Sequence, residues 1–190
     1  MTLQKKFGML HDSNKCIGCQ SCSIACRAEN RVPSGVYRLQ VWVNGPRGEH
    51  PNLAMDFHRQ SCVMCEKPPC VPVCPTGASY INEQGVVLVD QEKCVGCKYC
   101  IAACPYAARF TNPDTGAASK CTFCWEGRVS KGEQPACASV CPTNAMVFGD
   151  LNDPKSELRT AMAKSHIIRP KEHLATKPKL FIIPNVRGDK

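Results

Sequence analysis

Alternation of apolar and polar residues is confined to a few short segments of this 190-residue chain. Residues 37–43 alternate strictly, which is typical of a half-buried strand, and residues 53–58 follow a turn-rich stretch and can return as its partner. Residues 80–81 and 86–89 are two shorter apolar runs on either side of an Asn-Glu-Gln-Gly turn. The pattern therefore predicts two β-hairpins.

The end of the chain predicts a helix followed by extended backbone. Asp153-Pro154 can cap and begin a helix that runs to about Lys164, with Leu158 and Met162 on one face. Beyond this helix, three prolines punctuate a partly apolar tail. A tail of this kind usually packs along another surface. That surface can equally be the body of the same protein or a partner subunit.

No segment is apolar enough to span a membrane. The apolar runs at 86–89 and 180–183 are strand-length, whereas a membrane helix needs ~18 or more apolar residues. Residues 1–8 contain neither an apolar signal core nor a twin arginine. We therefore expect no direct membrane span and no export signal, so that any attachment to a membrane comes through a partner.

The cysteines carry the chemistry of the chain. Three thiolates close together, followed about one helical turn later by a fourth and, in three groups, by proline, form the run that holds [4Fe–4S] clusters. Thiolates are soft, charged donors that suit iron–sulfur clusters. All sixteen cysteines fall into four such groups, although twelve residues, 125–136, interrupt the fourth group between Cys124 and Cys137. The groups predict four clusters and a protein that conducts electrons. The groups are Cys16, Cys19, Cys22 and Cys26; Cys62, Cys65, Cys70 and Cys74; Cys94, Cys97, Cys100 and Cys104; and Cys121, Cys124, Cys137 and Cys141.

Other uses of the cysteines explain the spacing less well. Zinc sites use Cys-x-x-Cys pairs separated by longer gaps, and a disulfide scaffold has no need of four copies of one metal-ligand spacing. The histidines have no metal-ligand spacing, and no catalytic triad, phosphate loop or dinucleotide motif is present. We therefore predict a redox protein without a catalytic centre of its own.

The formal charge of +8 is the second unusual feature. Basic residues are scattered along the chain, so we do not expect nucleic-acid binding. Each oxidised cubane with four thiolates carries roughly −2, so that four of them bring the protein to about neutral. We interpret the basic residues as compensation for buried anions. Because aromatic residues make up only 6% of the chain, we expect the clusters to supply much of the folding free energy.

The groups are expected to pair as in two-cluster ferredoxins. The hairpin predicted between the second and third groups pairs these two, with Cys74 and Cys104 crossing over. The first and fourth groups then pair by elimination, while sequential pairing (first with second, third with fourth) is the alternative. The predicted fold class is α+β, with two interleaved bacterial-ferredoxin-like halves, short hairpins and helices, inserted strands and a C-terminal tail. The expected parts are 1–61 and 111–150 for the outer half, 62–110 for the inner half, and 151–190 for a docking helix and tail.

Two further residues carry expectations. Arg27 follows Cys26 where the other groups have proline, and we expect a helix to continue through it. Trp42 lies in the alternating segment, and we expect it to pack rather than to relay electrons.

These motifs resemble those of the four-cluster electron-transfer (beta) subunits of membrane-bound molybdopterin oxidoreductases, most of all those of polysulfide and thiosulfate reductases. The likeness covers nearly the whole chain. The cluster motifs are shared across the wider family, whereas the short insert and the tail carry the narrower match. The matching segments are residues 14–22, 70–80, 94–97, 102–106, 120–124, 135–137, 141–143, 148–150 and 176–181.

The resemblance implies which cysteines share a cluster. The implied sets are site 1 with Cys16, Cys19, Cys22 and Cys141; site 2 with Cys62, Cys65, Cys70 and Cys104; site 3 with Cys94, Cys97, Cys100 and Cys74; and site 4 with Cys121, Cys124, Cys137 and Cys26. Some relatives have tryptophan at the position of Cys97 and hold a three-iron cluster, so the cysteine here implies four cubanes. The resemblance also implies that site 1 lies nearest the molybdenum subunit and site 4 nearest the membrane subunit.

The implied function is that of a non-catalytic subunit of a larger complex. It would pass electrons from a quinol-oxidising integral membrane subunit to a molybdopterin catalytic subunit that reduces polysulfide or thiosulfate. The implied location is peripheral to the cytoplasmic membrane, on its periplasmic face, after export with the catalytic subunit. The alternatives are a stand-alone soluble polyferredoxin and the beta subunit of a dimethyl sulfoxide, tetrathionate, arsenate or formate enzyme.

Overall fold

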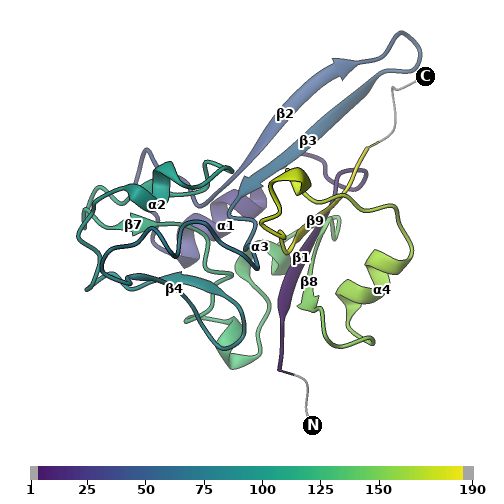
Figure 1. Cartoon of the computed structure of the whole chain (residues 1–190). Coiled ribbons are helices and arrows are strands. Elements are labelled where there is room, and N and C mark those ends of the chain that lie inside the picture. Colours follow the sequence, from purple (N-terminus) through teal and green to yellow (C-terminus); the bar gives the residue numbers. More distant parts are fainter. Residues whose placement is uncertain (1–3, 186–190) are drawn as a thin grey trace.

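The protein consists of small sheets and short helices joined by long loops (Figure 1). The computed structural model describes residues 4–185, so the expectations for residues 1–3 and 186–190 lie outside it. The mixed content agrees with the predicted α+β class. The strands are β1 (Phe7–Asp12), β2 (Leu39–Arg47), β3 (Ala54–Ser61), β4 (Ser79–Ile81), β5 (Val87–Val89), β6 (Phe110–Thr111), β7 (Ala118–Ser119), β8 (Met146–Asp150) and β9 (Leu180–Ile183); the α-helices are α1 (Ser21–Glu29), α2 (Tyr99–Ala102), α3 (Ala136–Ser139) and α4 (Glu157–Ala163).

The largest sheet joins segments that are far apart in the chain. β1 lies between β8 and β9, antiparallel to the first and parallel to the second. Met9 is the register partner of both Phe148 and Leu180, and all three side chains are buried. The tail therefore packs on its own protein body, which decides between the two surfaces that the sequence left open. The docking role expected for 151–190 stays a prediction for the exposed part of that segment.

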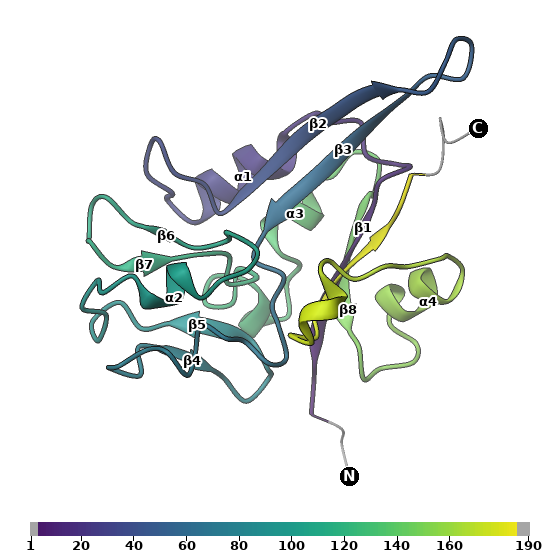
Figure 2. The same ribbon diagram turned by 45° about the horizontal axis from the view of Figure 1, so that its top comes forward.

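The long predicted hairpin is confirmed, and it projects from the body as an arm (Figures 1 and 2). β2 and β3 pair antiparallel with Trp42 opposite His58. Only the start of β2 is buried, at Leu39 and Val41. Trp42 does not pack as expected, because 52% of its surface is exposed and its indole N–H donates to the side chain of Gln60.

Two smaller hairpins lie in the middle of the chain. β4 and β5 pair antiparallel with Tyr80 opposite Leu88, which confirms the second predicted hairpin. β6 and β7 form another, which no pattern predicted because strands of two residues are too short to show alternation. Val86 and Val87 are fully buried and anchor this region in the core.

The predicted C-terminal helix begins later than expected. Asp153 does not cap it, because its carboxylate accepts the N–H of Lys155 in the preceding turn. Ser156 is the cap, and its hydroxyl accepts the N–H of Arg159 at 3.2 Å. The predicted apolar face is confirmed, since Leu158 is fully buried in a cluster that Met162 packs against.

The core is small and contains many of the cysteines. Nearly half of them are buried among apolar side chains, including Cys26, Cys100 and Cys137. The largest aromatic contacts surround Phe148, whose ring centroid lies 5.3 Å from that of Phe7 and 5.3 Å from that of Phe123. With so few large side chains in the core, we expect clusters held by the cysteines to supply much of the folding free energy.

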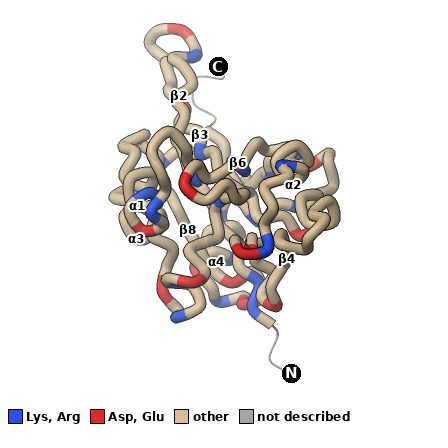
Figure 3. Tube along the Cα trace, turned by 90° about the vertical axis from the view of Figure 1, so that its left-hand side faces the viewer, with Lys and Arg blue, Asp and Glu red and all other residues tan. Residues whose placement is uncertain are grey.

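The surface carries charges of both signs. Lys and Arg residues are interspersed with Asp and Glu along the trace (Figure 3). Among residues 4–185, no helix has the length and apolar character that crossing a membrane requires.

Candidate iron–sulfur sites

The four Cys-x-x-Cys loops share one backbone conformation. The residue before the second cysteine is left-handed in every group, with φ of 68° at Gly18, 51° at Met64, 69° at Gly96 and 56° at Phe123. Successive backbone N–H groups in such a turn form a concavity that suits anions and iron–sulfur clusters. The repeated spacing in the sequence therefore corresponds to a repeated loop.

The cysteines of each implied site come together in space. All four members of sites 1, 3 and 4 line one cavity each, with volumes of about 390, 330 and 270 Å³, part of which is open to solvent. In site 2, burial raises the pKa of the Cys65 thiol to about 12, and the nearby Cys62, Cys70 and Cys104 add to the rise. All sixteen cysteines are free thiols. In residues 4–185, no three His, Cys, Asp or Glu side chains converge as they would on a single metal ion.

Short helical segments connect the sites in pairs. α1 contributes Cys22 to site 1 and Cys26 to site 4, while Cys137 of α3 belongs to site 4 and Cys141 returns to site 1. In the same way, the last cysteines of the second and third groups exchange between sites 2 and 3. The structure therefore joins the first group to the fourth and the second to the third, and does not show the sequential alternative.

Arg27 organises the loop that follows α1. The helix continues through it, as expected. Its guanidinium donates to the carbonyl oxygens of Val32, Pro33 and Val36 and lies 4.9 Å from the centre of the Tyr37 ring. The Arg27 side chain therefore fixes the conformation of the loop between α1 and β2.

The four sites form a row in the order 1, 4, 2, 3. Cys137 of site 4 lies near enough to Cys22 of site 1 for the charges of the two thiolates to interact. Cys121 of site 4 lies equally within range of the charge of Cys62 of site 2. All four cysteines of site 4 are buried, whereas one cysteine each of sites 1 and 3 is exposed. The burial of its cysteines does not favour the implied position of site 4 nearest the membrane subunit, which stays a prediction. The exposed ends are sites 1 and 3.

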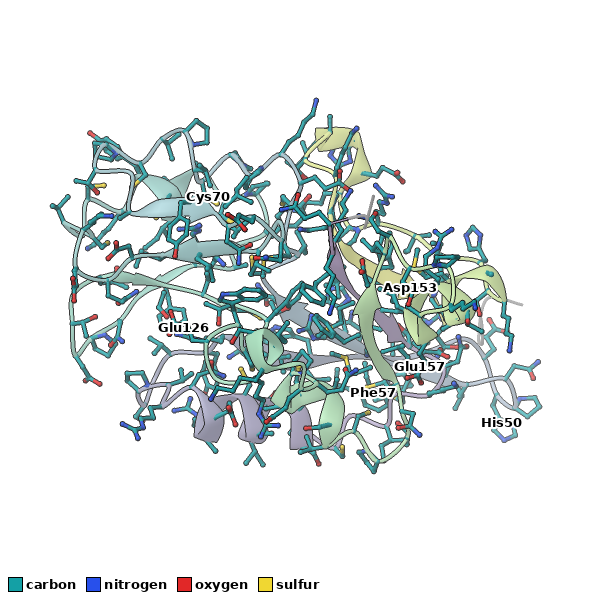
Figure 4. The ribbon with its side chains drawn as sticks, turned by 90° about the horizontal axis from the view of Figure 1, so that it is seen from below. His50, Phe57, Cys70, Glu126, Asp153 and Glu157 are labelled. Carbon is teal, nitrogen blue, oxygen red and sulfur yellow. The ribbon has the colours of Figure 1, made fainter. Side chains whose placement is uncertain are left out.

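The arm formed by β2 and β3 lies at the site 1 end of this row. Phe57 of β3 packs beside Gly18, within the first Cys-x-x-Cys loop. His50 lies near the tip of the arm, and Cys70 of site 2 lies on the opposite side of the molecule from it (Figure 4).

Backbone N–H groups donate to the cysteine sulfurs. The N–H of Ser79 donates to Cys74 at 3.4 Å, and the N–H of Ala145 donates to Cys141 at 3.3 Å. The threonine hydroxyl two residues after each of these cysteines lies 3.7 Å from its sulfur. Hydrogen bonds of this kind stabilise a thiolate and shift the reduction potential of a cluster.

Burial opposes ionisation of the interior thiols. It raises the pKa of Cys137 to about 12, although the charge of Arg59 acts in the other direction. At the exposed end of site 1, the hydroxyl of Ser21 lies 3.3 Å from the sulfur of Cys19 and lowers its pKa. Because thiolates ligate iron, cluster assembly must release protons from the thiols, and burial opposes this release at Cys137.

Buried positive charge shows that the cysteine sites suit anionic clusters. Four lysine and arginine side chains are buried in the described part of the chain, whereas no described Asp or Glu is buried. An unpaired buried charge is strongly destabilising, so these cations need buried negative charge nearby. Clusters held by thiolates supply it, in agreement with the interpretation of the +8 charge. The four are Arg59, Arg109, Lys120 and Lys179.

The sequence patterns did not single out these cations. Lys120 directly precedes a cysteine group, but Lys15 and Lys93 occupy the same position before two other groups. The side chains of Lys15 and Lys93 are 58% and 67% exposed, whereas Lys120 is 1% exposed. Position in the motif is therefore the only sequence signal, and it does not distinguish the buried lysine from the other two.

Comparison with known proteins decides the family. A family model described as a 4Fe-4S dicluster domain matches residues 53–151, and a second model of the same description matches residues 15–78. The chain belongs to the 4Fe-4S dicluster family. In this 4Fe-4S dicluster protein the two matched segments together include every cysteine.

Relatives of this 4Fe-4S dicluster protein match it over most of their length. It is 59% identical over 187 residues to the B subunit of polysulfide reductase from Wolinella succinogenes, covering 98% of both proteins. It is 47% identical to a protein NrfC homolog of Haemophilus influenzae, covering 97% of this chain and 83% of the relative. It is also 47% identical to thiosulfate reductase electron transfer subunit PhsB of Salmonella typhi, covering 90% of this chain and 88% of the relative. The resemblance to polysulfide and thiosulfate reductase subunits is confirmed.

Gly18→Ala should remove the cluster of site 1 and leave the others. A Cβ at Gly18 would lie 2.4 Å from the Phe57 ring, and its φ of +68° costs a residue with a side chain about 1–2 kcal/mol. Gly35→Ala is the matched control, because Gly35 has a φ of +80° and open space around it. Iron content and the number of paramagnetic cluster signals should fall only in the Gly18 variant. Equal losses in both variants, or no loss in either, would contradict the prediction.

Proposed function

We propose that this 4Fe-4S dicluster protein is the non-catalytic electron-transfer subunit of a membrane-associated polysulfide or thiosulfate reductase. The observation that carries the proposal is the row of four cysteine sets, with one exposed cysteine in the set at each end and no exposed cysteine in the two sets between them. A [4Fe–4S] cluster at each site would supply one-electron redox chemistry. The chain holds the sites in line and sets their potentials through hydrogen bonds, burial and charge. The names of two relatives, the polysulfide reductase B subunit and thiosulfate reductase electron transfer subunit PhsB, supply the class of complex.

The exposed ends of the row are the proposed contacts with the partners. We assign the site 1 end, with Cys19, to the molybdopterin catalytic subunit and the site 3 end, with Cys97, to the integral membrane quinol-binding subunit. Exposed apolar residues flank the cysteines at both ends, as expected of surfaces that bind another protein. Electrons then enter at site 3 and leave at site 1. The flanking residues are Ile17 and Ile24 at site 1, and Val95 and Tyr99 at site 3.

The proposed organisation is two interleaved ferredoxin-like halves. Residues 1–61 and 111–150 form the outer half with sites 1 and 4, and residues 62–110 form the inner half with sites 2 and 3. The pairing of β1 with β8 and the crossing cysteines support this division. Within the C-terminal part expected for residues 151–190, β9 pairs with β1 of the outer half. Together with its partners, the protein would be peripheral to the cytoplasmic membrane, on the periplasmic face.

Anaerobic purification from solubilised membranes through a tag on this chain tests the proposal. We expect a molybdopterin protein and a multi-span membrane protein in the same fraction, with about sixteen irons per copy of this chain, four for each of the four cysteine groups. The catalytic partner can then be assayed with polysulfide and thiosulfate. Recovery of this chain alone, brown and soluble, would overturn the proposal in favour of a free polyferredoxin.

Cys97→Ser and Cys97→Trp should each alter or remove one cluster while the chain still folds. Cys97 is exposed, so the change leaves no buried cavity or unpaired buried group. A redox titration followed by electron paramagnetic resonance should show a changed or missing site 3 signal and three unchanged ones. Four signals identical to those of the unmodified protein would refute the assignment of Cys97 to site 3.

A further inference from the structure

A buried basic side chain lies at each of the three boundaries between neighbouring sites. Arg59 lies between sites 1 and 4, Lys120 between sites 4 and 2, and Arg109 between sites 2 and 3. We propose that these three side chains are counter-charges that raise the reduction potentials of the clusters on both sides of each boundary. The inference rests on the proposed function, since it requires a cluster at every site.

Lys120 joins the two halves of the row. Its Nζ donates to the carbonyl oxygen of Val87 in β5 and, at 2.8 Å, to the carbonyl oxygen of Cys121. Val87 belongs to the inner half and Cys121 to the outer half, so the ammonium group is fixed across the boundary. Burial and the charge of Arg109 lower the pKa of Lys120, whereas the charges of Cys62, Cys121 and Cys70, from sites 2 and 4, raise it and so favour the ammonium form. No described carboxylate pairs with it, in contrast to Lys93 of the third motif.

Arg109 links the two sites of the inner half. Its Nη2 donates to the sulfur of Cys70 in site 2 at 2.9 Å and to the hydroxyl oxygen of Ser79 at 2.7 Å. Cys100 of site 3 also acts on its charge. Its other terminal nitrogen is buried without a hydrogen-bond partner. The guanidinium therefore faces thiols of both inner sites.

Arg59 occupies the corresponding place in the outer half. It is 3% exposed, and none of its three side-chain nitrogens has a hydrogen-bond partner. It lines the cavity of site 1, and its charge acts on Cys22 of site 1 and on Cys121 and Cys137 of site 4. A guanidinium with five N–H donors and no partner indicates an anionic group in the space that the cysteines enclose.

All three cations should change the reduction potentials of the clusters in the same direction. Reduction adds negative charge to a cluster, so a nearby buried cation stabilises the reduced form more than the oxidised form. The interaction is strong because the side chains are away from water, where charges are poorly screened. Removing one cation should therefore lower the potentials of the two clusters beside it, and leave the two others nearly unchanged.

The test compares Lys120→Met with Lys93→Met in the iron-loaded protein. Both lysines directly precede a cysteine group, but the side chain of Lys93 is 67% exposed and pairs with Asp90 at 3.1 Å. In an anaerobic redox titration at a fixed solution potential, Lys120→Met should lower the ratio of reduced to oxidised cluster at least tenfold at sites 4 and 2. For a one-electron couple, this change corresponds to a fall of about 59 mV in the reduction potential of each cluster. Sites 1 and 3, and all four sites of Lys93→Met, should keep their potentials. Signals are assigned with the corresponding cysteine variants.

The outcomes separate this inference from the proposed function. An unmodified protein that holds fewer than four clusters would refute the proposed function. Four clusters with potentials unmoved in Lys120→Met, or moved equally at all sites or equally in Lys93→Met, would overturn the inference alone. If Lys120→Met does not fold, Arg59→Met and Arg109→Met test the inference instead. Each substitution must lower the reduction potentials of the two clusters beside that arginine and leave the other two unchanged.

Discussion

Removal of the iron should unfold this protein. The buried cations Arg59, Arg109 and Lys120 face cysteine sites and have no described carboxylate partner. Loss of one partner of a buried ion pair costs about 3–5 kcal/mol, and three such losses approach the whole stability of a domain, about 5–15 kcal/mol. The protein would also lose the clusters that connect helices α1 and α3 through their cysteines. We therefore expect a metal-free chain without a cooperative fold.

Chelation under anaerobic, reducing conditions gives the measurement. Far-ultraviolet circular dichroism should lose its native form, and thermal melting should lose its sharp transition. Reconstitution with iron and sulfide is the control, and it should restore both signals. A metal-free protein with a native spectrum and cooperative melting would show that the polypeptide core is sufficient by itself.

In the proposed complex, Cys121→Ser should abolish electron transfer from the membrane subunit to the catalytic subunit. Cys121 is buried in site 4, next to Cys62 of site 2, so it lies in the interior of the row. Without site 4, site 1 has no neighbouring site from which to receive an electron. Because a hydroxyl is a poor replacement for a thiolate at iron, the conservative change is sufficient.

The measurement is quinol-driven substrate reduction by the intact complex, with a soluble dye as the control. The dye reduces the catalytic subunit directly, so its activity should be unchanged in the variant. Quinol-driven activity should fall to background. If both activities stay normal, site 4 does not lie on the electron path, and the interior position assigned to it has no functional meaning.

The sequence predicted what is encoded locally. The cysteine spacing predicted the four Cys-x-x-Cys loops because the ligands of such a loop are neighbours in the chain. The fourth cysteine of each set comes from a distant group, and the family resemblance rather than the spacing implied it. Alternation found β2–β3 and β4–β5 for the same reason. β1 was missed because four consecutive residues, Gly8 to His11, are buried, so that no alternation marks it. β6 and β7 were missed because they are only two residues long.

The order of the sites and the buried cations could not be predicted from the sequence. The order depends on how the two halves meet, which places Cys121 beside Cys62 and leaves the site 3 end exposed. Lys15, Lys93 and Lys120 hold equivalent positions before a cysteine, and only the packing of β5 against the start of the fourth group buries the last of them. Both features come from tertiary contacts between distant segments.

The place of β1 in its sheet has a consequence for the synthesis of the protein. Its partners begin at Met146 and Leu180, so β1 leaves the ribosome early and stays unpaired until most of the chain has been translated. The cysteines of sites 2 and 3 are complete once Cys104 has emerged, whereas sites 1 and 4 wait for Cys137 and Cys141. With the proposed cysteine sets, the first of these four groups to be translated is therefore among the last that can receive iron.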